Sequence, residues 1–247
     1  WTDIRESIHL EEVSFWYPGT EEPVIREQNL DIRANTTVGL VGSTGGGKTT
    51  LVDIVLGLLR PQSGELRVDG TQIADHNVRR WQRSLGYVPQ HIYLTDDSIT
   101  RNIAFGVPPR FIDHDRVQSA AQMANLAGFV EHELPDSYDT LVGERGIRLS
   151  GGQRQRIGIA RALYREPAVL VMDEATSALD TLTEEAVMDA IHNLAGRKTI
   201  ILIAHRITTV RECDAIHVLE KGRITASGTY DELMQTSEQF RRMAKER

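Results

Sequence analysis

Residues 42–49, GSTGGGKT, have the glycine spacing and the Lys-Thr ending of a loop that binds phosphate. Glycines let the backbone fold back on itself, so that successive N–H groups converge on phosphate oxygens. We expect Lys48 to reach the β- and γ-phosphates of a nucleotide and the Thr49 hydroxyl to coordinate Mg²⁺. The predicted nucleotide-binding residues of this loop are Gly42, Ser43, Thr44, Gly45, Gly46, Gly47, Lys48, Thr49 and Thr50.

Two carboxylates end an apolar run further along the chain, in VLVMDE at 169–174. Neighbouring strand residues point to opposite sides, so one acid can face the Mg²⁺ shell and the other an attacking water. Asp173 suits the metal role, usually through a water, and Glu174 suits the role of general base or water-orienting group. Alone, such a pair is more often a solvated turn, and the phosphate loop upstream favours the functional interpretation.

A third stretch, LSGGQRQR at 149–156, contains no nucleophile or metal ligand. Ser150, Gly151 and Gly152 nevertheless lie where a helix should begin, with backbone N–H groups free to bind an anion. A plain N-cap serine ahead of a helix is compatible with the same pattern.

Strand and helix patterns surround these stretches. A short apolar run, TTVGLVG, leads into the phosphate loop, and Leu51, Ile54, Val55, Leu58 and Leu59 predict a helix after it with one buried face. The runs 168–174 and 198–205 read as strands buried on both faces. A hairpin turning at Lys221–Gly222 precedes a last helix, which Thr229 and Glu232 cap.

The element order predicts an α/β fold of the P-loop NTPase class with a mostly parallel core sheet. The first thirty-odd residues alternate like antiparallel strands and indicate a β-subdomain at the N-terminus. Residues from about 96 to 166 are mostly helical and form an insertion, which carries the LSGGQ stretch.

Composition limits the function classes. The chain has 247 residues, of which 40% are hydrophobic, and a formal net charge of −7, which disfavours nucleic acid as a partner. The single cysteine, Cys213, excludes an internal disulfide, indicates a reducing compartment and is expected to be a small buried hydrophobe. No apolar run approaches the ~18 residues of a membrane span. The first residue is Trp1 and no signal peptide follows, so we interpret the chain as a fragment of a longer protein.

The ordered set of motifs resembles the nucleotide-binding domain of the ATP-binding cassette (ABC) family, over essentially the whole chain. LSGGQ matches the signature motif of that family, GSTGGGKT its Walker A loop and AVLVMDE its Walker B strand. Thr44 and Gly46 stand where serine is frequent, and neither removes a phosphate-binding N–H group.

The resemblance implies ATP and Mg²⁺ as cofactors and assigns three further residues. Tyr17, in VSFWYP, matches the aromatic that stacks on adenine. Gln90, in YVPQ, matches the glutamine that contacts Mg²⁺ or the water and reports nucleotide state. His205, in IAHR, matches the histidine that binds the γ-phosphate and holds Glu174. The implied catalytic residues are Glu174, His205, Lys48 and Gln90, and the implied metal site comprises Thr49, Gln90 and Asp173.

The resemblance also implies a partner. Two cassettes of this family pack head to tail, so that each signature motif closes over the ATP on the Walker A loop of the other. In a homodimer of this chain the contacts across the interface would come from Ser150, Gly151, Gly152, Gln153 and, in the SALD stretch at 177–180, Asp180.

TLVGERG at 140–146 resembles the loop with which ABC exporters contact the coupling helices of their transmembrane domain, through Glu144 and Arg145. The expected function is therefore the ATP-hydrolysing motor of an exporter at the cytoplasmic face of the cell membrane, with the transmembrane domain preceding Trp1. Residues 48–59 and 87–106 resemble the branch that flips lipid-linked oligosaccharides, so the expected substrate is a lipid or a lipid-linked saccharide.

Two other functions are compatible with parts of the motif set. A non-transport ABC ATPase acting on DNA or ribosomes is disfavoured by the absence of a heptad run between the Walker A loop and the signature, by the single cassette and by the acidic charge. A degenerate cassette that only regulates usually lacks the glutamate or the histidine, and this sequence has both Glu174 and His205.

Overall fold

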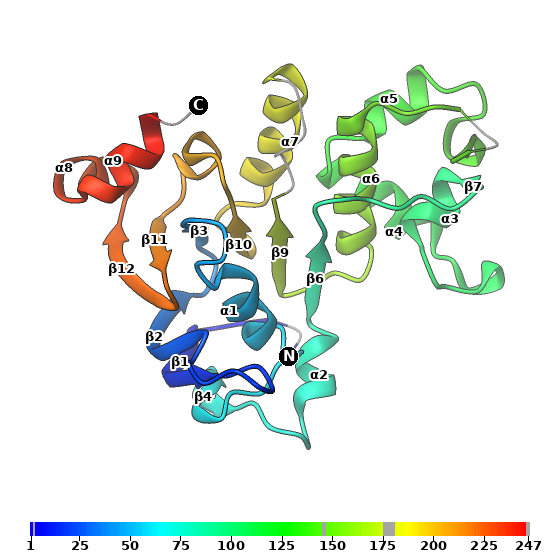
Figure 1. Cartoon of the computed structure of the whole chain (residues 1–247). Coiled ribbons are helices and arrows are strands. Elements are labelled where there is room, and N and C mark those ends of the chain that lie inside the picture. The colour runs from blue at the N-terminus through cyan, green and yellow to red at the C-terminus, as the bar shows by residue number, and fades with distance from the viewer. Residues whose placement is uncertain (2, 145–146, 175–180, 246–247) are drawn as a thin grey trace. The chain divides into compact units, whose positions relative to one another are not determined.

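The computed structural model of the chain describes residues 1, 3–144, 147–174 and 181–245 (Figure 1). The chain divides into two compact units. The first comprises Trp1–Leu85, Ala168–Glu174 and Ala195–Arg247, and the second comprises Gly86–Pro167 and Ala175–Leu194. The range of about 96–166 that sequence patterns assign to a helical insertion lies inside the second unit.

An antiparallel sheet opens the first unit. Its strand order is β2-β1-β4-β5, with β1 at Ser7–Phe15, β2 at Ile25–Arg33, β4 at Ser63–Val68 and β5 at Thr71–Gln72. Ile8 and Leu10 on β1 pair with Ile32 and Leu30 on β2, and all four side chains are buried. The alternation of buried and exposed positions gives this sheet one core face, which confirms the predicted N-terminal β-subdomain.

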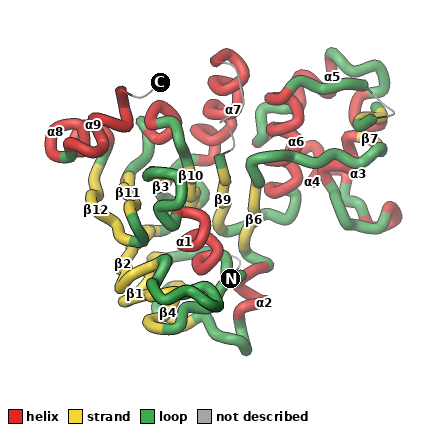
Figure 2. The backbone as a smooth tube through the Cα atoms, viewed as in Figure 1, coloured by secondary structure: helices red, strands yellow, loops and turns green. Residues whose placement is uncertain are grey.

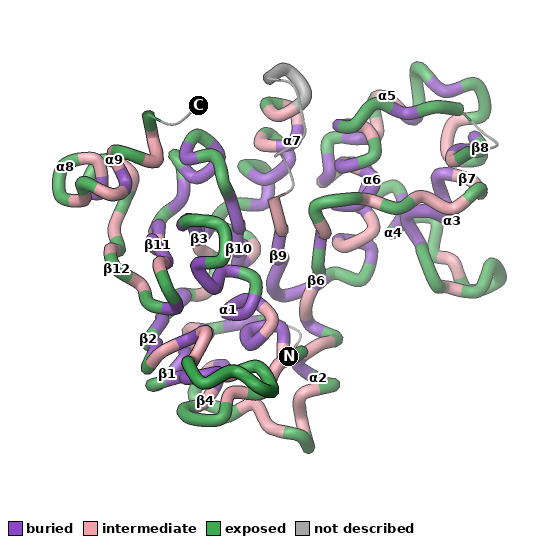
Figure 3. Tube along the Cα trace, viewed as in Figure 1, coloured by how far each residue is buried: buried purple, intermediate pink, exposed green. Residues whose placement is uncertain are grey.

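The second sheet of this unit is mostly parallel. Its strands there follow the order β12-β11-β3-β10-β9, and they are β3 (Thr37–Val41), β9 (Val169–Asp173), β10 (Thr199–Ile203), β11 (Ala215–Glu220) and β12 (Arg223–Gly228). Only β12 runs antiparallel to its neighbour in this part of the sheet. Every residue of β3 and β10 is buried (Figure 3), as the continuous apolar runs predict.

Helix α1 (Lys48–Val55) follows β3 and is shorter than predicted. Gly57 has a φ of 67°, its N–H donates to the Ile54 carbonyl, and the N–H of Leu58 donates to the Asp53 carbonyl. These two bonds form a Schellman motif, which ends the helix several residues before Pro61. The expectation that Leu58 lies on the buried face is wrong, because its side chain is 64% exposed.

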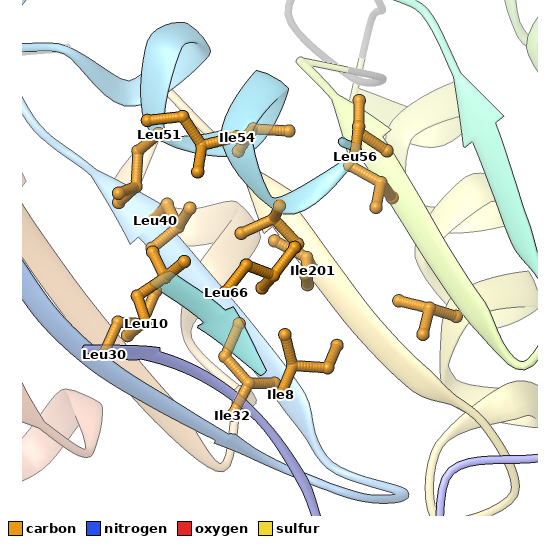
Figure 4. Close-up of a cluster of buried hydrophobic side chains, with 14 of the residues drawn as sticks. Ile8, Leu10, Leu30, Ile32, Leu40, Leu51, Ile54, Leu56, Leu66 and Ile201 are labelled. Atoms are coloured by element: carbon orange, nitrogen blue, oxygen red, sulfur yellow. The ribbon is translucent and has the colours of Figure 1, made fainter. Parts of the chain in front are cut away.

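One hydrophobic core joins α1 to both sheets of the first unit. Leu51 and Ile54 of α1 point toward Leu10, Leu40 and the strands around them, as Figure 4 shows. The short helix α2 (Val78–Gln82) adds the fully buried Trp81, whose Nε1–H donates to the Val55 carbonyl at 2.7 Å. This bond satisfies one of the carbonyls that the C-terminal end of α1 leaves without an intrahelical partner.

Helices and loops make up most of the second unit (Figure 2). The helices are α3 (Ile99–Ile103), α4 (His114–Met123), α5 (Ala127–His132), α6 (Gly151–Leu163) and α7 (Thr181–Leu194). Two 3₁₀ turns, Pro109–Phe111 and Ser137–Asp139, and the short strands β7 (Asp97–Ser98) and β8 (Leu141–Val142) connect them. Helix α6 packs against α3, α4 and α7. Strand β6 (Leu85–Val88) starts at the boundary of the two units.

The C-terminal segment of the first unit contains two helices where one was expected. Thr229 and Glu232 form the predicted capping box at the start of α8 (Tyr230–Thr236), but Ser237 takes an extended conformation and α9 (Glu238–Lys245) begins after it. A 3₁₀ turn at Ile207–Val210 precedes β11, and the predicted burial of Cys213 is confirmed. Within the described residues, no helix combines the length and the apolar character that a membrane span requires.

The partly buried imidazole of His217 on β11 should make the stability of the fold depend on pH. Its Nδ1 lies 2.7 Å from Ser227 Oγ, its Nε2 is buried with no hydrogen-bond partner in the described part of the chain, and burial lowers its pKa to about 4. The unfolded chain therefore takes up this proton first as the pH falls. We expect the free energy of unfolding to drop between pH 6.5 and 4, by up to about 3 kcal/mol.

Urea denaturation at a series of pH values measures this dependence. His217→Gln should flatten the curve over that range, whereas His76→Gln, at an exposed histidine, should leave it unchanged. A His217→Gln variant with the full wild-type slope would contradict the assignment.

Candidate active site

The carboxyl ends of three parallel strands define one edge of the core sheet. Ile203 on β10 pairs with Asp173 on β9 and with Leu40 on β3, so the three strands end within one residue of each other. The segments that leave these ends are therefore neighbours, and ligands of open α/β sheets bind at this kind of edge. The segments after β3, β9 and β10 contain the phosphate loop, Glu174 and His205, respectively.

The phosphate loop turns from β3 into α1. At Gly42, with a φ of 153°, a Cβ would lie 2.0 Å from the Leu219 carbonyl oxygen, so this position excludes every side chain. The first helical bond of α1 runs from the Leu51 N–H to the Gly47 carbonyl. The N–H groups of the first turn have neither an intrahelical partner nor a side-chain cap, and no acidic residue stands there. This helix start is a ready-made site for an anion.

Lys48 lies at the start of α1 and its side chain is buried. Its ammonium group donates to the Gly42 carbonyl at 2.7 Å and to the Ser43 carbonyl at 3.1 Å. Burial lowers the pKa of Lys48, and the negative charges of Glu174 and Asp173 act in the opposite direction. The two loop carbonyls thus hold the ammonium group at the loop, and the two carboxylates favour its charged form.

Glu174 follows the last residue of β9 in a left-handed conformation, with a φ of 49°. Its N–H donates to the Ile203 carbonyl at 2.9 Å, which extends the pairing with β10. Strand alternation therefore does not set its side-chain direction, contrary to the argument from sequence. Its Oε1 lies 2.5 Å from His205 Nε2. A non-glycine residue in this backbone region is strained, and such strain concentrates at functional sites.

A pocket of about 260 Å³ collects these groups. Most of the predicted phosphate-loop residues line it together with the Glu174–His205 pair, and its lining consists of Val24, Thr44, Gly45, Gly46, Gly47, Lys48, Thr49, Thr50, Glu174 and His205. Gly42 and Ser43 do not line the pocket and instead hold the Lys48 ammonium with their carbonyls.

Two residues near the pocket had no role in the sequence argument. Val24 lines it from the loop before β2, and nothing in the sequence around a lone valine indicates this. Asp53 lies on α1 one turn after Thr49, and its carboxyl pKa is raised by burial and by the nearby charge of Asp173. The four-residue spacing from Thr49 is the signal that could have drawn attention to Asp53.

Tyr17 reaches the start of α1 from the end of β1. Its hydroxyl lies 3.1 Å from Thr50 Oγ1, and its ring packs edge-on against Phe15 with the centroids 5.0 Å apart. The ring is 40% exposed and does not line the pocket. These two contacts fix the orientation of the ring beside the phosphate loop.

The remaining predicted site residues belong to the second unit. Ser150 caps α6, since its Oγ accepts from the Gln153 N–H and Gln153 Oε1 accepts from the Ser150 N–H. The N–H groups of Gly151 and Gly152 lie in the first turn, before any intrahelical bond. Gln90 is exposed in the loop after β6. Asp180 lies outside the described residues.

A second pocket, of about 570 Å³, lies within the second unit. Its lining consists of Ile92, Tyr93, Leu94, Gly143, Glu144, Ile147, Arg148, Leu149 and Arg154. Tyr93 is 75% exposed, and the Glu144 N–H donates to Asp96 Oδ1 at 2.6 Å. Arg145, the other predicted contact residue of this loop, is not among the described residues.

Comparisons with known proteins give a consistent result. The model of the family described as ABC transporter matches residues 25–177. The ATP-dependent lipid A-core flippase of Alkalilimnicola ehrlichii is 43% identical over 230 residues, which are 93% of this chain and 39% of that protein. The putative multidrug export ATP-binding/permease protein YgaD of Bacillus subtilis is 40% identical over 240 residues, which are 97% of this chain and 41% of that protein.

Among solved structures, a bacterial Atm1-family ABC exporter with ATP bound matches with a TM-score of 0.85 and 36% identity. The match covers 98% of this chain and 42% of that one. The chain thus spans about two-fifths of the length of the proteins it matches.

The Tyr17 hydroxyl gives a first test of the pocket. Tyr17→Phe keeps the ring and removes its bond to Thr50, so the ring must be ordered when a nucleotide binds. We expect the dissociation constant for ATP to rise about 2- to 10-fold, the equivalent of one net hydrogen bond. Calorimetric titration measures it, with Tyr93→Phe in the second unit as the control, and equal affinities of Tyr17→Phe and wild type would contradict this role of the hydroxyl.

Proposed function

The chain belongs to the ABC transporter family as an ATP-binding, ATP-hydrolysing domain, and we propose that it powers export through a membrane part outside this chain. The observation that carries the proposal is the single pocket in which the phosphate loop, Lys48 and the Glu174–His205 pair meet. A phosphate cradle, a cation and a carboxylate that can position a water are groups that phosphoryl transfer to water uses, and the imidazole can add a contact to the phosphate.

Nucleotide binding rests on the backbone of the loop and the start of α1. Their unpaired N–H groups donate to the phosphates, and the helix dipole adds positive potential. Two carbonyl bonds hold the Lys48 ammonium at the phosphate loop. When a nucleotide binds, the ammonium would replace these carbonyls with phosphate oxygens. Tyr17, with its ring oriented by Thr50 and Phe15, supplies the stacking face for adenine.

Mg²⁺ fits the residues at this edge. Thr49 lines the pocket, and the nearby charge of Asp173 affects the pKa values of both Lys48 and Asp53, which supports a role for its carboxylate at this helix start. A hydroxyl and a carboxylate are hard oxygen ligands, and Mg²⁺ takes few of these from protein and the rest from phosphates and water. Gln90 is the third proposed contact. When bound, the ion neutralises charge on the β- and γ-phosphates.

Glu174 and His205 are proposed to act on the attacking water. Glu174 accepts its proton or orients it, and His205 contacts the γ-phosphate while its Nε2 holds the glutamate. The 2.5 Å contact fixes both side chains against one another, and the pairing of Glu174 N–H with β10 fixes the backbone. Positioning of this kind, rather than covalent chemistry, carries the rate in phosphoryl transfer.

The site is proposed to be completed by a second copy of the chain, packed head to tail. Ser150 Oγ accepts a hydrogen bond from the Gln153 N–H, and within the described part of the chain its own O–H donates to no other group, so it can donate to a γ-phosphate. Gly151 and Gly152 add backbone N–H groups and no side chain to obstruct the approach. Gln153 and Asp180 are the other proposed contacts across this interface.

Coupling to the membrane part is proposed to use the second pocket. Its exposed apolar side chains, Tyr93 and Ile147, suit the end of a helix, and Glu144 also lines the pocket. Arg145, which follows Glu144 in the sequence, is the other proposed contact residue. This assignment puts the chain at the cytoplasmic face of the membrane. We propose a lipid or lipid-linked saccharide as the substrate, which the name of the Alkalilimnicola ehrlichii relative supports.

The ATPase rate as a function of protein concentration tests the proposal. Wild-type specific activity should rise with concentration, because each copy must find its partner by diffusion. Glu174→Gln should lose at least about 100-fold in rate, the usual share of a general base, and should accumulate an ATP-dependent dimer in gel filtration. Glu185→Gln, which removes an exposed charge on α7, is the matched control and should behave as wild type.

Two outcomes would count against it. A specific activity independent of concentration, without a dimer in either form, means that each chain hydrolyses ATP alone. Full activity in Glu174→Gln means that another group handles the water.

A further inference from the structure

The turn between β11 and β12 touches the phosphate loop from behind. Lys221 and Gly222 form this turn, with φ values of 47° and 78°. The Gly222 N–H donates to the Gly46 carbonyl at 2.9 Å, and the Gly222 carbonyl accepts from the Arg26 N–H at 3.0 Å. A hairpin that comes some 175 residues after the loop therefore hydrogen-bonds directly to the loop backbone.

The approach is made by backbone atoms, without side chains between them. A Cβ on Gly42 would lie 2.0 Å from the Leu219 carbonyl oxygen, and one on Gly46 would lie 2.9 Å from it. A Cβ on Gly222 would lie 2.0 Å from the carbonyl oxygen of Val24, which itself lines the nucleotide pocket. Backbone carbonyls cannot rotate away as a side chain would, so the loop, the hairpin and the segment before β2 constrain one another.

The bond to Gly46 has a directional consequence. In a trans peptide the C=O and the following N–H point in opposite directions. When the Gly46 carbonyl points at the hairpin, the Gly47 N–H of the same peptide plane points away from it. Gly46 and Gly47 both line the nucleotide pocket, so an N–H that points away from the hairpin is available to donate to phosphate oxygens there.

We propose that the β11–β12 turn is a positioning element for the phosphate loop. Gly222 holds the Gly46 carbonyl, and the Gly46–Gly47 peptide is thereby oriented to donate to phosphate. The inference rests on the nucleotide binding proposed above and adds Gly222 to its positioning residues, in a segment that no phosphate-binding motif includes.

The chain contains a matched turn for comparison. Asp69 and Gly70 connect β4 to β5 with φ values of 48° and 72°, nearly those of Lys221 and Gly222. A Cβ on Gly70 would have no atom within 4 Å. The turn conformation alone thus accounts for glycine at 70, whereas Gly222 also meets a contact requirement.

Gly222→Ala and Gly70→Ala separate the two effects. Both variants put alanine at a similar left-handed φ and should lower the melting temperature, Gly222→Ala by more because its Cβ also meets the Val24 carbonyl. Only Gly222→Ala displaces the Gly46 carbonyl. We expect its dissociation constant for Mg²⁺-ADP, titrated calorimetrically against folded protein, to rise at least 10-fold, while that of Gly70→Ala stays within 2-fold of wild type.

Asparagine variants relieve the strain of a positive φ but keep the clash of the added Cβ at position 222. Asn tolerates a positive φ, so Gly70→Asn should recover the melting temperature. Gly222→Asn still carries a Cβ against the Val24 carbonyl and should bind Mg²⁺-ADP as weakly as Gly222→Ala. Wild-type affinity in either Gly222 variant, or an equal loss in the Gly70 variants, would overturn the proposal.

Hydrogen exchange of the unmodified chain gives a test that needs no variant to fold. Mg²⁺-ADP should slow exchange in residues 219–223 several-fold and leave residues 69–72 unchanged, because binding fixes the peptide to which Gly222 N–H donates. Unchanged exchange at 219–223 in a chain that binds Mg²⁺-ADP would refute the positioning role. Absence of Mg²⁺-ADP binding by the wild type would instead contradict the proposed function itself.

Discussion

The register of three parallel strands is the constraint on which the site depends. Because Ile203 pairs with both Asp173 and Leu40, the ends of β3, β9 and β10 coincide. A shift of one residue in either pairing would move Glu174 or His205 along the strand direction by about 3.3 Å, more than the length of their mutual contact. Burial of every residue of β3 and β10 holds this register, since slippage would disrupt packing on both faces at once.

Electrostatics at this edge are balanced between burial and neighbouring charge. The Lys48 ammonium loses hydration, which two loop carbonyls and the charges of Asp173 and Glu174 offset only in part, so that its pKa stays lowered. Two carboxylates beside a phosphate site would repel the ligand if they acted alone. Lys48, the helix dipole and the proposed Mg²⁺ would counter that repulsion, so both acids could lie close to the bound phosphates.

The proposed site is assembled from two kinds of surface. The P-loop pocket is built wholly within the first unit, by residues from four separate parts of the chain. The start of α6, in the second unit, presents N–H groups and a hydroxyl for an anion that the same unit does not supply. If these surfaces make contact only when ATP lies between them, ATP binding would drive the association of two copies. Hydrolysis of the ATP would then release them.

The sequence alone determined the features that depend on a few consecutive residues. The phosphate loop, the start of α6 at Ser150 and the strand character of 168–174 and 198–205 all follow from glycine placement, capping chemistry or continuous apolar runs, which act locally. The antiparallel subdomain and the hairpin at Lys221–Gly222 were predicted for the same reason.

The tertiary structure decided what depends on residues distant in sequence. The end of α1 at Val55 was fixed by a Schellman motif, although apolar periodicity continued to Leu59. The left-handed backbone of Glu174, the place of Val24 in the pocket and the hairpin bond to Gly46 arise from segments distant in the sequence. The contact of Glu174 with His205 also joins distant segments, and only the family resemblance implied it. No local pattern encodes such contacts, because they exist only once the sheet has brought its strand ends to one edge.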